Sequence, residues 1–139
     1  MTSNLALPPH LTQARIETNA TKTARYAALT ADFNPIHVDP DFAQRTPFGA
    51  PINHGTLGLS LLAQAIETTL GPVPHQVNVR FSRPAPVGVS LIAAGDLLET
   101  GDGYHVHVTT DDGVRVIEGT LHLLEPTKIE QKESSDDRN

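Results

Sequence analysis

The sequence of 139 residues contains no cysteine and no tryptophan, and only 4% of its residues are aromatic. Without cysteine the chain cannot form disulfides, thiolate nucleophiles, Cys-ligated zinc centres or iron–sulfur clusters. Lys and Arg together number 10 against 16 Asp and Glu, and the resulting net charge of −6 argues against a general nucleic-acid or anionic-membrane surface. No apolar run reaches the roughly 18 residues that a membrane-spanning helix needs.

The composition that remains is that of a globular protein, with 38% hydrophobic and 19% charged residues. A length of 139 residues predicts one domain, which we assign to residues 1–125. Residues 126–139 are rich in charge and low in apolar side chains, so we expect a disordered tail. The first ten residues lack the basic and apolar regions of a signal peptide, and a cytoplasmic protein is therefore the simplest expectation.

The first half of the chain favours helices. A short strand is predicted at 14–18, followed by a helix over 19–32 that Asn19 or Thr21 can cap. A second helix at 38–45 has Asp39 as its cap and Pro40 at its first position. The longest apolar segment, 54–72, predicts a helix that is buried nearly all round in its first half.

The second half alternates polar and apolar residues, which is typical of strands. Strands are predicted at 76–82, 89–99, 104–110 and 114–125, with Val77, Val79 and Phe81 facing one way and turns at 101–103 and 111–113. A switch of parity near Glu118-Gly119 indicates a β-bulge. An antiparallel meander of about four strands around one long helix gives an α+β protein of the hot-dog type, although other α+β sandwiches share this element order.

The stretch "TADFNPIH" places Asp32, Asn34 and His37 within six residues. A carboxylate and an imidazole that bind the same water can remove its proton and return it, and Asn34 can orient either group. The alternative is a polar turn, because Asp and Asn side chains bond their own backbone ahead of a proline.

A second candidate is Gly55, at the start of the long helix. The first N–H groups of a helix have no partner, and glycine admits a ligand oxygen close to the backbone, so Gly55 could polarise a carbonyl. The alternative is a helix start with a glycine for tight packing. For His54 a structural role is favoured, and Ser60 lies about one turn further along. His105, His107 and His122 could bind zinc, but a solvated sheet face explains them more simply, so no metal is expected.

These residues occur within three blocks that resemble the (R)-specific enoyl-CoA hydratases of the MaoC-like dehydratase family. The first block is "YAALTADFNPIHVDPDFA" at 26–43, the second is "FGAPINHGTL" at 48–57, and the third is "VRFSRPAPVG" at 79–88. The blocks occur in the family's order and span most of the chain.

The resemblance implies a hot-dog homodimer that adds water to trans-2-enoyl-CoA, gives (R)-3-hydroxyacyl-CoA, and uses no cofactor. It implies that Asp32 and His37 activate the water with the support of Asn34. The Gly55 amide would then bind the thioester oxygen, and Ser60 would lie near the substrate.

Two residues depart from the family pattern. Ala31 stands where glycine is usual, so the turn must use an ordinary backbone or carry strain. Asn53 replaces a small apolar residue and would place a polar group near the thioester. Arg80, Arg83 and Arg45 are candidates for the phosphates of CoA. Two other functions stay open, a hot-dog acyl-CoA thioesterase and a non-catalytic acyl-thioester-binding subunit of a dehydratase.

Overall fold

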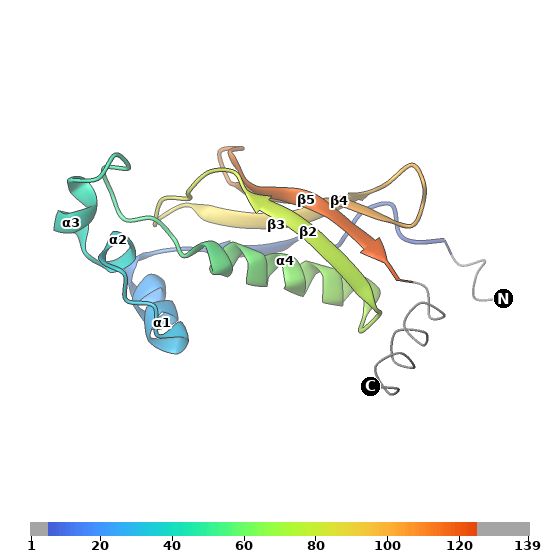
Figure 1. Cartoon of the computed structure of the whole chain (residues 1–139), viewed down its shortest axis with the longest axis horizontal. Helices are drawn as coiled ribbons and strands as arrows, with labels where there is room; N and C mark the ends of the chain where they lie inside the picture. Colours follow the sequence, from blue (N-terminus) through green and yellow to red (C-terminus); the bar gives the residue numbers. More distant parts are fainter. Residues whose placement is uncertain (1–5, 125–139) are drawn as a thin grey trace, which may run out of the picture.

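The computed structural model describes residues 6–124, in which one long helix lies along an antiparallel sheet (Figure 1). The predicted tail at 126–139 lies outside the described residues. In chain order the elements are β1 (Ala14–Glu17), α1 (Ala20–Thr30), α2 (Pro35–Val38), α3 (Pro40–Gln44), α4 (Gly55–Leu70), β2 (His75–Phe81), β3 (Ser90–Leu97), β4 (Gly103–Thr110) and β5 (Arg115–Leu123).

The sheet has five strands in the order β1-β3-β4-β5-β2, and every neighbouring pair is antiparallel. The predicted meander of four strands is wrong in one respect. Strands β3, β4 and β5 follow one another as hairpins, but β2 pairs with β5 at one edge and β1 pairs with β3 at the other. The long connection from β2 to β3 therefore crosses the sheet, which the alternation of side chains within each strand cannot reveal.

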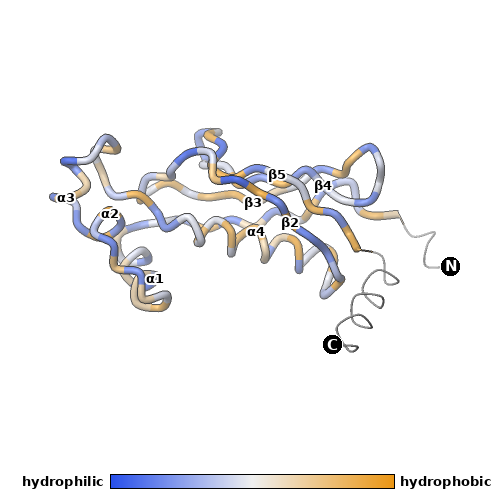
Figure 2. The backbone as a smooth tube through the Cα atoms, viewed as in Figure 1, coloured by the Kyte–Doolittle hydropathy of each residue, from blue (hydrophilic) through white to orange (hydrophobic). Residues whose placement is uncertain are grey.

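Helix α4 packs on one face of this sheet and supplies much of the core. Its buried residues are Gly58, Leu61, Leu62, Ala65 and Ile66, and Figure 2 shows apolar residues recurring along α4 and β3. The prediction that the first half of this helix is buried nearly all round is wrong, since Leu59 is 36% exposed and Ser60 and Ala63 face outward. The α+β arrangement itself is as predicted.

Helices α1 to α3 form a segment beyond the N-terminal end of α4 (Figure 1). The Asn19 side chain accepts from Lys22 N–H at the start of α1, as predicted. The Asp39 carboxylate caps α3, where Pro40 occupies the first helical position. These caps fix the entry of each short helix.

One prediction about the strands needs correction. The register between β4 and β5 shifts from Val108–Ile117 to Thr109–Arg115, which puts the bulge at Val116 rather than at Glu118-Gly119. Phe81 lies on the same face of β2 as Val77 and Val79, as predicted, and its ring reaches Gly55 of α4 although it is 56% exposed. Within residues 6–124, no helix has the length and apolar character needed to cross a membrane. The cytoplasmic location stays a prediction.

Candidate active site

The position of Asp32 is set by the end of α1. Ala31 adopts a left-handed backbone (φ 57°, ψ 35°), which turns the chain so that Asp32 N–H donates to the carbonyl oxygen of Ala27 at 3.0 Å. This conformation costs an L-residue roughly 1–2 kcal/mol, because its Cβ comes too close to the following carbonyl oxygen. Of the two possibilities that the sequence left open at Ala31, the structure has the strained backbone, and the strain lies next to a predicted catalytic carboxylate.

Asn34 organises the turn between Asp32 and His37. Its side-chain oxygen accepts from Ile36 N–H at 3.1 Å and so caps α2, while its own N–H donates to Asp32 Oδ1 at 3.3 Å. Asn34 therefore both starts the short helix that carries His37 and orients the carboxylate.

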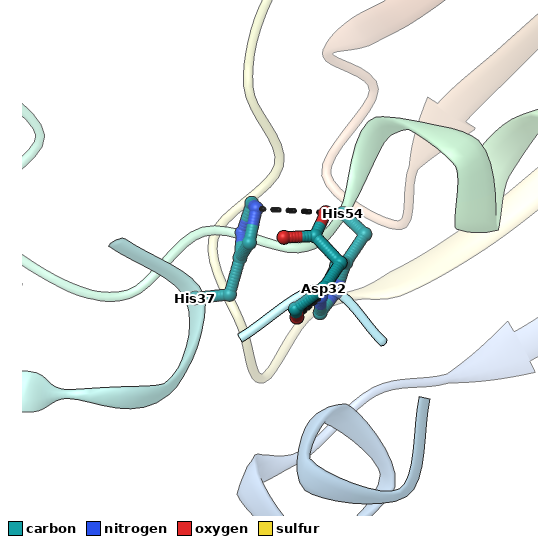
Figure 3. Close-up of side chains that lie close together, drawn as sticks. All are labelled: Asp32, His37 and His54. Atoms are coloured by element: carbon teal, nitrogen blue, oxygen red, sulfur yellow. Dashed lines mark hydrogen bonds and ion pairs between the residues drawn. The ribbon is translucent and has the colours of Figure 1, made fainter. Parts of the chain in front are cut away.

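The His37 imidazole is fixed by one hydrogen bond, from its Nδ1–H to the carbonyl oxygen of Ile52 at 2.8 Å. A carbonyl can only accept, so in the neutral ring Nε2 carries the lone pair. Nε2 lies 4.0 Å from Asp32 Oδ2 (Figure 3), and the two side chains are 12% and 49% exposed. Both atoms can reach one water at an ordinary distance of about 2.8 Å, so the pair can share it.

Gly55 is the first residue of α4 and lines a cavity of about 290 Å³, which His37 also lines. Its N–H donates to no other group within residues 6–124 and is free for a ligand oxygen. A Cβ placed on Gly55 would lie 3.3 Å from Phe81 Cε1, so the Phe81 ring stands directly over this residue. The cavity thus brings a basic nitrogen and a free helix N–H together.

The predicted substrate-binding residues are placed differently from one another. Asn53 and Arg83 line the cavity, whereas Ser60 lies on the exposed side of α4 and is not part of its lining. The Asn53 amide is held by the loop before β3, with Nδ2 3.0 Å from the Pro86 carbonyl oxygen. Its Oδ1 has no partner among the described residues. Their roles in binding substrate stay predictions.

Arg80 lies away from this cavity, on the sheet face opposite α4. Its guanidinium donates to Glu118 Oε2 at 3.2 Å, and Ser82 donates to the same oxygen. These bonds hold the pKa of Glu118 below its ordinary value. A larger hollow of about 540 Å³ lies here, but neither Asp32 nor His37 lines it. His37 lines the smaller cavity, where we therefore place the candidate site.

Within residues 6–124, the acid and histidine side chains close enough to share one metal ion are Asp32, His37 and His54, whose ligand atoms lie within 4.8 Å of one another. The two rings are stacked, with centroids 3.9 Å apart and planes 25° apart. Imidazole lone pairs lie in the ring plane, so nearly parallel rings do not converge on one ion as metal ligands do. This geometry favours acid–base chemistry over metal binding.

Comparison with known proteins places this site in a family. The family model described as "MaoC like domain" matches residues 6–117. The chain belongs to this family.

Two relatives carry names that state an activity. The (R)-specific enoyl-CoA hydratase of Aeromonas caviae is 39% identical over 77 residues, covering 53% of this chain and 58% of its own length. The 3-hydroxyacyl-thioester dehydratase Z of Mycobacterium tuberculosis is 37% identical over 84 residues, covering 55% of this chain and 56% of its own length. The matched region thus spans little more than half of either relative.

Solved structures of R-hydratases agree with the fold. The (R)-hydratase from A. caviae involved in PHA biosynthesis superposes with a TM-score of 0.70 and 27% identity, covering 87% of this chain and 98% of that chain. An unliganded R-hydratase from Pseudomonas aeruginosa gives a TM-score of 0.72 at 25% identity, covering 89% and 84%. These matches confirm the predicted hot-dog fold and the resemblance to R-hydratases.

Two parts of the site were missed by the sequence analysis, the Phe81 ring over Gly55 and the contacts that His54 makes with the acid–base pair. The period-two pattern placed Phe81 on the same face of its strand as Val77 and Val79, but alternation within one strand does not show which residue of the helix the ring meets. The contacts of His54 could have been predicted from its position in the sequence. It directly precedes Gly55, so it must lie beside the start of α4.

Proposed function

We propose that this protein is a hydro-lyase that adds water across the double bond of a trans-2-enoyl-CoA to give a (R)-3-hydroxyacyl-CoA, and that it catalyses the reverse dehydration. The observation that carries the proposal is that His37 Nε2 lies 4.0 Å from the Asp32 carboxylate, while His37 and Gly55, whose N–H is free, line the same cavity. The names of the A. caviae and M. tuberculosis relatives support it.

In this mechanism the water lies between Asp32 and His37, and one of them removes a proton as the oxygen attacks C3. The new C3–O bond displaces the π electrons of the C2–C3 double bond toward the thioester, and the carbonyl oxygen becomes an enolate oxygen. The Gly55 N–H stabilises that charge, a contribution worth about 3 kcal/mol where single donors have been removed from other enzymes. The same acid–base pair then returns the proton to C2.

The direct test is to mix the purified protein with crotonyl-CoA and to follow the loss of the enoyl absorbance. Asp32→Asn and His37→Gln should each lower kcat on the order of 10²–10⁴-fold, because each removes a proton-transfer group. His105→Gln, on the opposite face of the sheet, is the matched control and should leave kcat unchanged. Folded wild-type protein with no activity on crotonyl-CoA or on longer enoyl thioesters would disprove the hydratase proposal.

The same assay separates the two alternatives. A thioesterase directs water to the carbonyl carbon and releases free CoA, which a thiol reagent detects. A non-catalytic subunit binds the 3-hydroxyacyl thioester without turnover. The pairing of His37 Nε2 with the Asp32 carboxylate at 4.0 Å favours the hydratase over both alternatives.

We also propose that the substrate is an acyl-CoA and that the protein is a homodimer. Arg83 lies at the cavity and can contact the CoA phosphates. Large apolar side chains are exposed in the α1–α3 segment at Leu29, Phe33, Val38 and Phe42, and shortly after it at Phe48. Several exposed side chains of this kind favour a protein partner. Sedimentation equilibrium should give twice the chain mass of 14.9 kDa.

A further inference from the structure

His54 has more contacts with the catalytic pair than a helix-start residue needs. It is 3% exposed and makes no side-chain cap at the start of α4. Its Nε2–H instead donates to the backbone carbonyl oxygen of Asp32 at 3.0 Å, across 22 positions of sequence. This bond ties the loop that carries the carboxylate to the helix that carries Gly55.

The same ring also supports His37. The two imidazoles stack with centroids 3.9 Å apart and an angle of 25°, so His54 limits the rotation of the His37 ring on one face (Figure 3). The Tyr26 and His54 rings pack edge to face with centroids 5.0 Å apart, and the Tyr26 hydroxyl shares a hydrogen bond of 2.8 Å with Thr56 Oγ1. His54 is therefore held in place by α1 and α4 together.

The protonation state of His54 follows from its partners. A carbonyl accepts the Nε2–H, while Nδ1 is buried without a partner among residues 6–124. A proton on Nδ1 would bury a donor with no acceptor, which costs about 1–3 kcal/mol, so the neutral ring is the one this site accommodates. A neutral ring stacks on His37 without adding a charge next to the acid–base pair.

We propose that His54 is a positioning residue that holds both members of the acid–base pair, Asp32 through its backbone and His37 through ring stacking. The inference rests on the proposed hydratase function. His54 lines the cavity but transfers no proton, because its Nε2–H is held by the Asp32 carbonyl oxygen and its Nδ1 is buried without a partner among residues 6–124.

Two variants separate the two contacts. His54→Phe keeps a ring against His37 and loses only the bond to Asp32, since Nδ1 has no partner to lose. His54→Gln keeps an amide donor and loses the ring. We expect His54→Gln to lower kcat about 10–100-fold with KM within threefold, as a misplaced catalytic group does, and His54→Phe to retain more activity. His105→Gln again serves as the control.

A double variant distinguishes positioning from general destabilisation. If His54 acts through His37, adding His54→Gln to His37→Gln should lower the residual kcat by less than threefold, because groups that act as a unit are not additive. A full 10–100-fold further loss would overturn the proposal in favour of a structural role. Thermal unfolding of each variant shows that the assayed protein is folded.

Histidine ring NMR provides a readout that does not depend on activity. The His37 ring resonance, assigned by its disappearance in His37→Gln, should move in His54→Gln as the stacked ring is lost and stay near its wild-type position in His54→Phe. An unmoved resonance together with wild-type kcat in His54→Gln would overturn the proposal. If wild-type protein shows no hydratase activity, the proposed function fails, whereas the resonance still decides whether His54 positions His37.

Discussion

Ala31 is the one non-glycine residue with a positive φ within residues 6–124, and it immediately precedes the predicted catalytic carboxylate. Its left-handed backbone lets Asp32 N–H bond the carbonyl oxygen of Ala27. The strained residue therefore lies where helix α1 ends, directly before the first residue of the acid–base pair.

Ala31→Gly should raise the free energy of unfolding by about 1 kcal/mol, because glycine adopts this conformation without the steric penalty and loses part of the gain to its more flexible unfolded state. Urea denaturation measures the change. Ala28→Gly, on the exposed side of the same helix, is the control and should lower stability by about 1 kcal/mol. A destabilised Ala31→Gly would show that the alanine is not strained.

His107 should make the stability of the protein depend on pH. Burial, with a smaller contribution from the Arg115 charge, lowers its pKa below the ordinary 6.5, against the opposing effects of Asp96 and Glu118. The unfolded chain then binds a proton more readily than the folded chain, so this residue costs stability as the pH falls from about 7 through the lowered pKa.

The variant His107→Gln should therefore lose less stability than wild type between pH 7 and pH 5, as measured by urea midpoints across that range. His105→Gln, on the same strand face but exposed, is the control. Equal pH profiles for His107→Gln and wild type would contradict the prediction.

Several site residues could be predicted from the sequence because their roles are local. The spacing of Asp32, Asn34 and His37 around a proline fixes a short turn whatever the rest of the chain does. Arg80 could not be placed in this way, because the Glu118 that binds it is 38 residues away on a paired strand. The stacking of His54 on His37 likewise depends on how α4 meets the α1–α3 segment.

At the scale of elements, the contact between α4 and the sheet depends on Gly58. A Cβ there would lie 2.9 Å from Ile117 Cδ1 and 3.7 Å from Val108 Cγ1, so the helix approaches β4 and β5 closely only because this position has no side chain. That approach sets the height of the helix start, and hence of Gly55, above the sheet.

Gly58→Ala should lower the free energy of unfolding by about 1–3 kcal/mol through overpacking. Ile117→Val removes the methyl group that the new Cβ would meet, so Gly58→Ala should cost less in the Ile117→Val background than in wild type. Urea denaturation of the four proteins gives the coupling. Additive losses would mean that the backbone, and not Ile117, absorbs the added methyl.

Elements were easier to predict than their pairing. The helix over 54–72 and the strand over 104–110 follow from periodicity within each segment, and both are present at nearly those bounds. The order of strands depends on contacts between distant segments, which is why β2 was expected beside β3 and lies beside β5. The bulge at Val116 was missed by two residues for a similar reason, since it is defined by its partner strand.

At the scale of the whole molecule, the two halves of the site belong to different parts of the structure. Asp32 and His37 lie in the α1–α3 segment, whose helices mainly contact one another, while Gly55 belongs to the helix that packs on the sheet. Hydrogen bonds from His37 to Ile52 and from His54 to Asp32 join the two parts.

This division makes the site sensitive to local unfolding. The α1–α3 segment buries few residues, so its opening should cost less free energy than unfolding of the sheet and α4. Hydratase activity should therefore disappear at a lower urea concentration than the sheet structure. The sequence has two tyrosines, and Tyr26→Phe leaves the buried Tyr104 as the only tyrosine reporter of the sheet.

Coincident loss of activity and of Tyr104 fluorescence would show instead that the molecule unfolds as one unit. If the two transitions separate, the hydrogen bond from His54 to Asp32 joins a stable scaffold to a catalytic segment that unfolds more easily. The fraction of molecules that can catalyse would then depend on how often this hydrogen bond is formed. A bound acyl thioester would contact both parts and favour the bonded state.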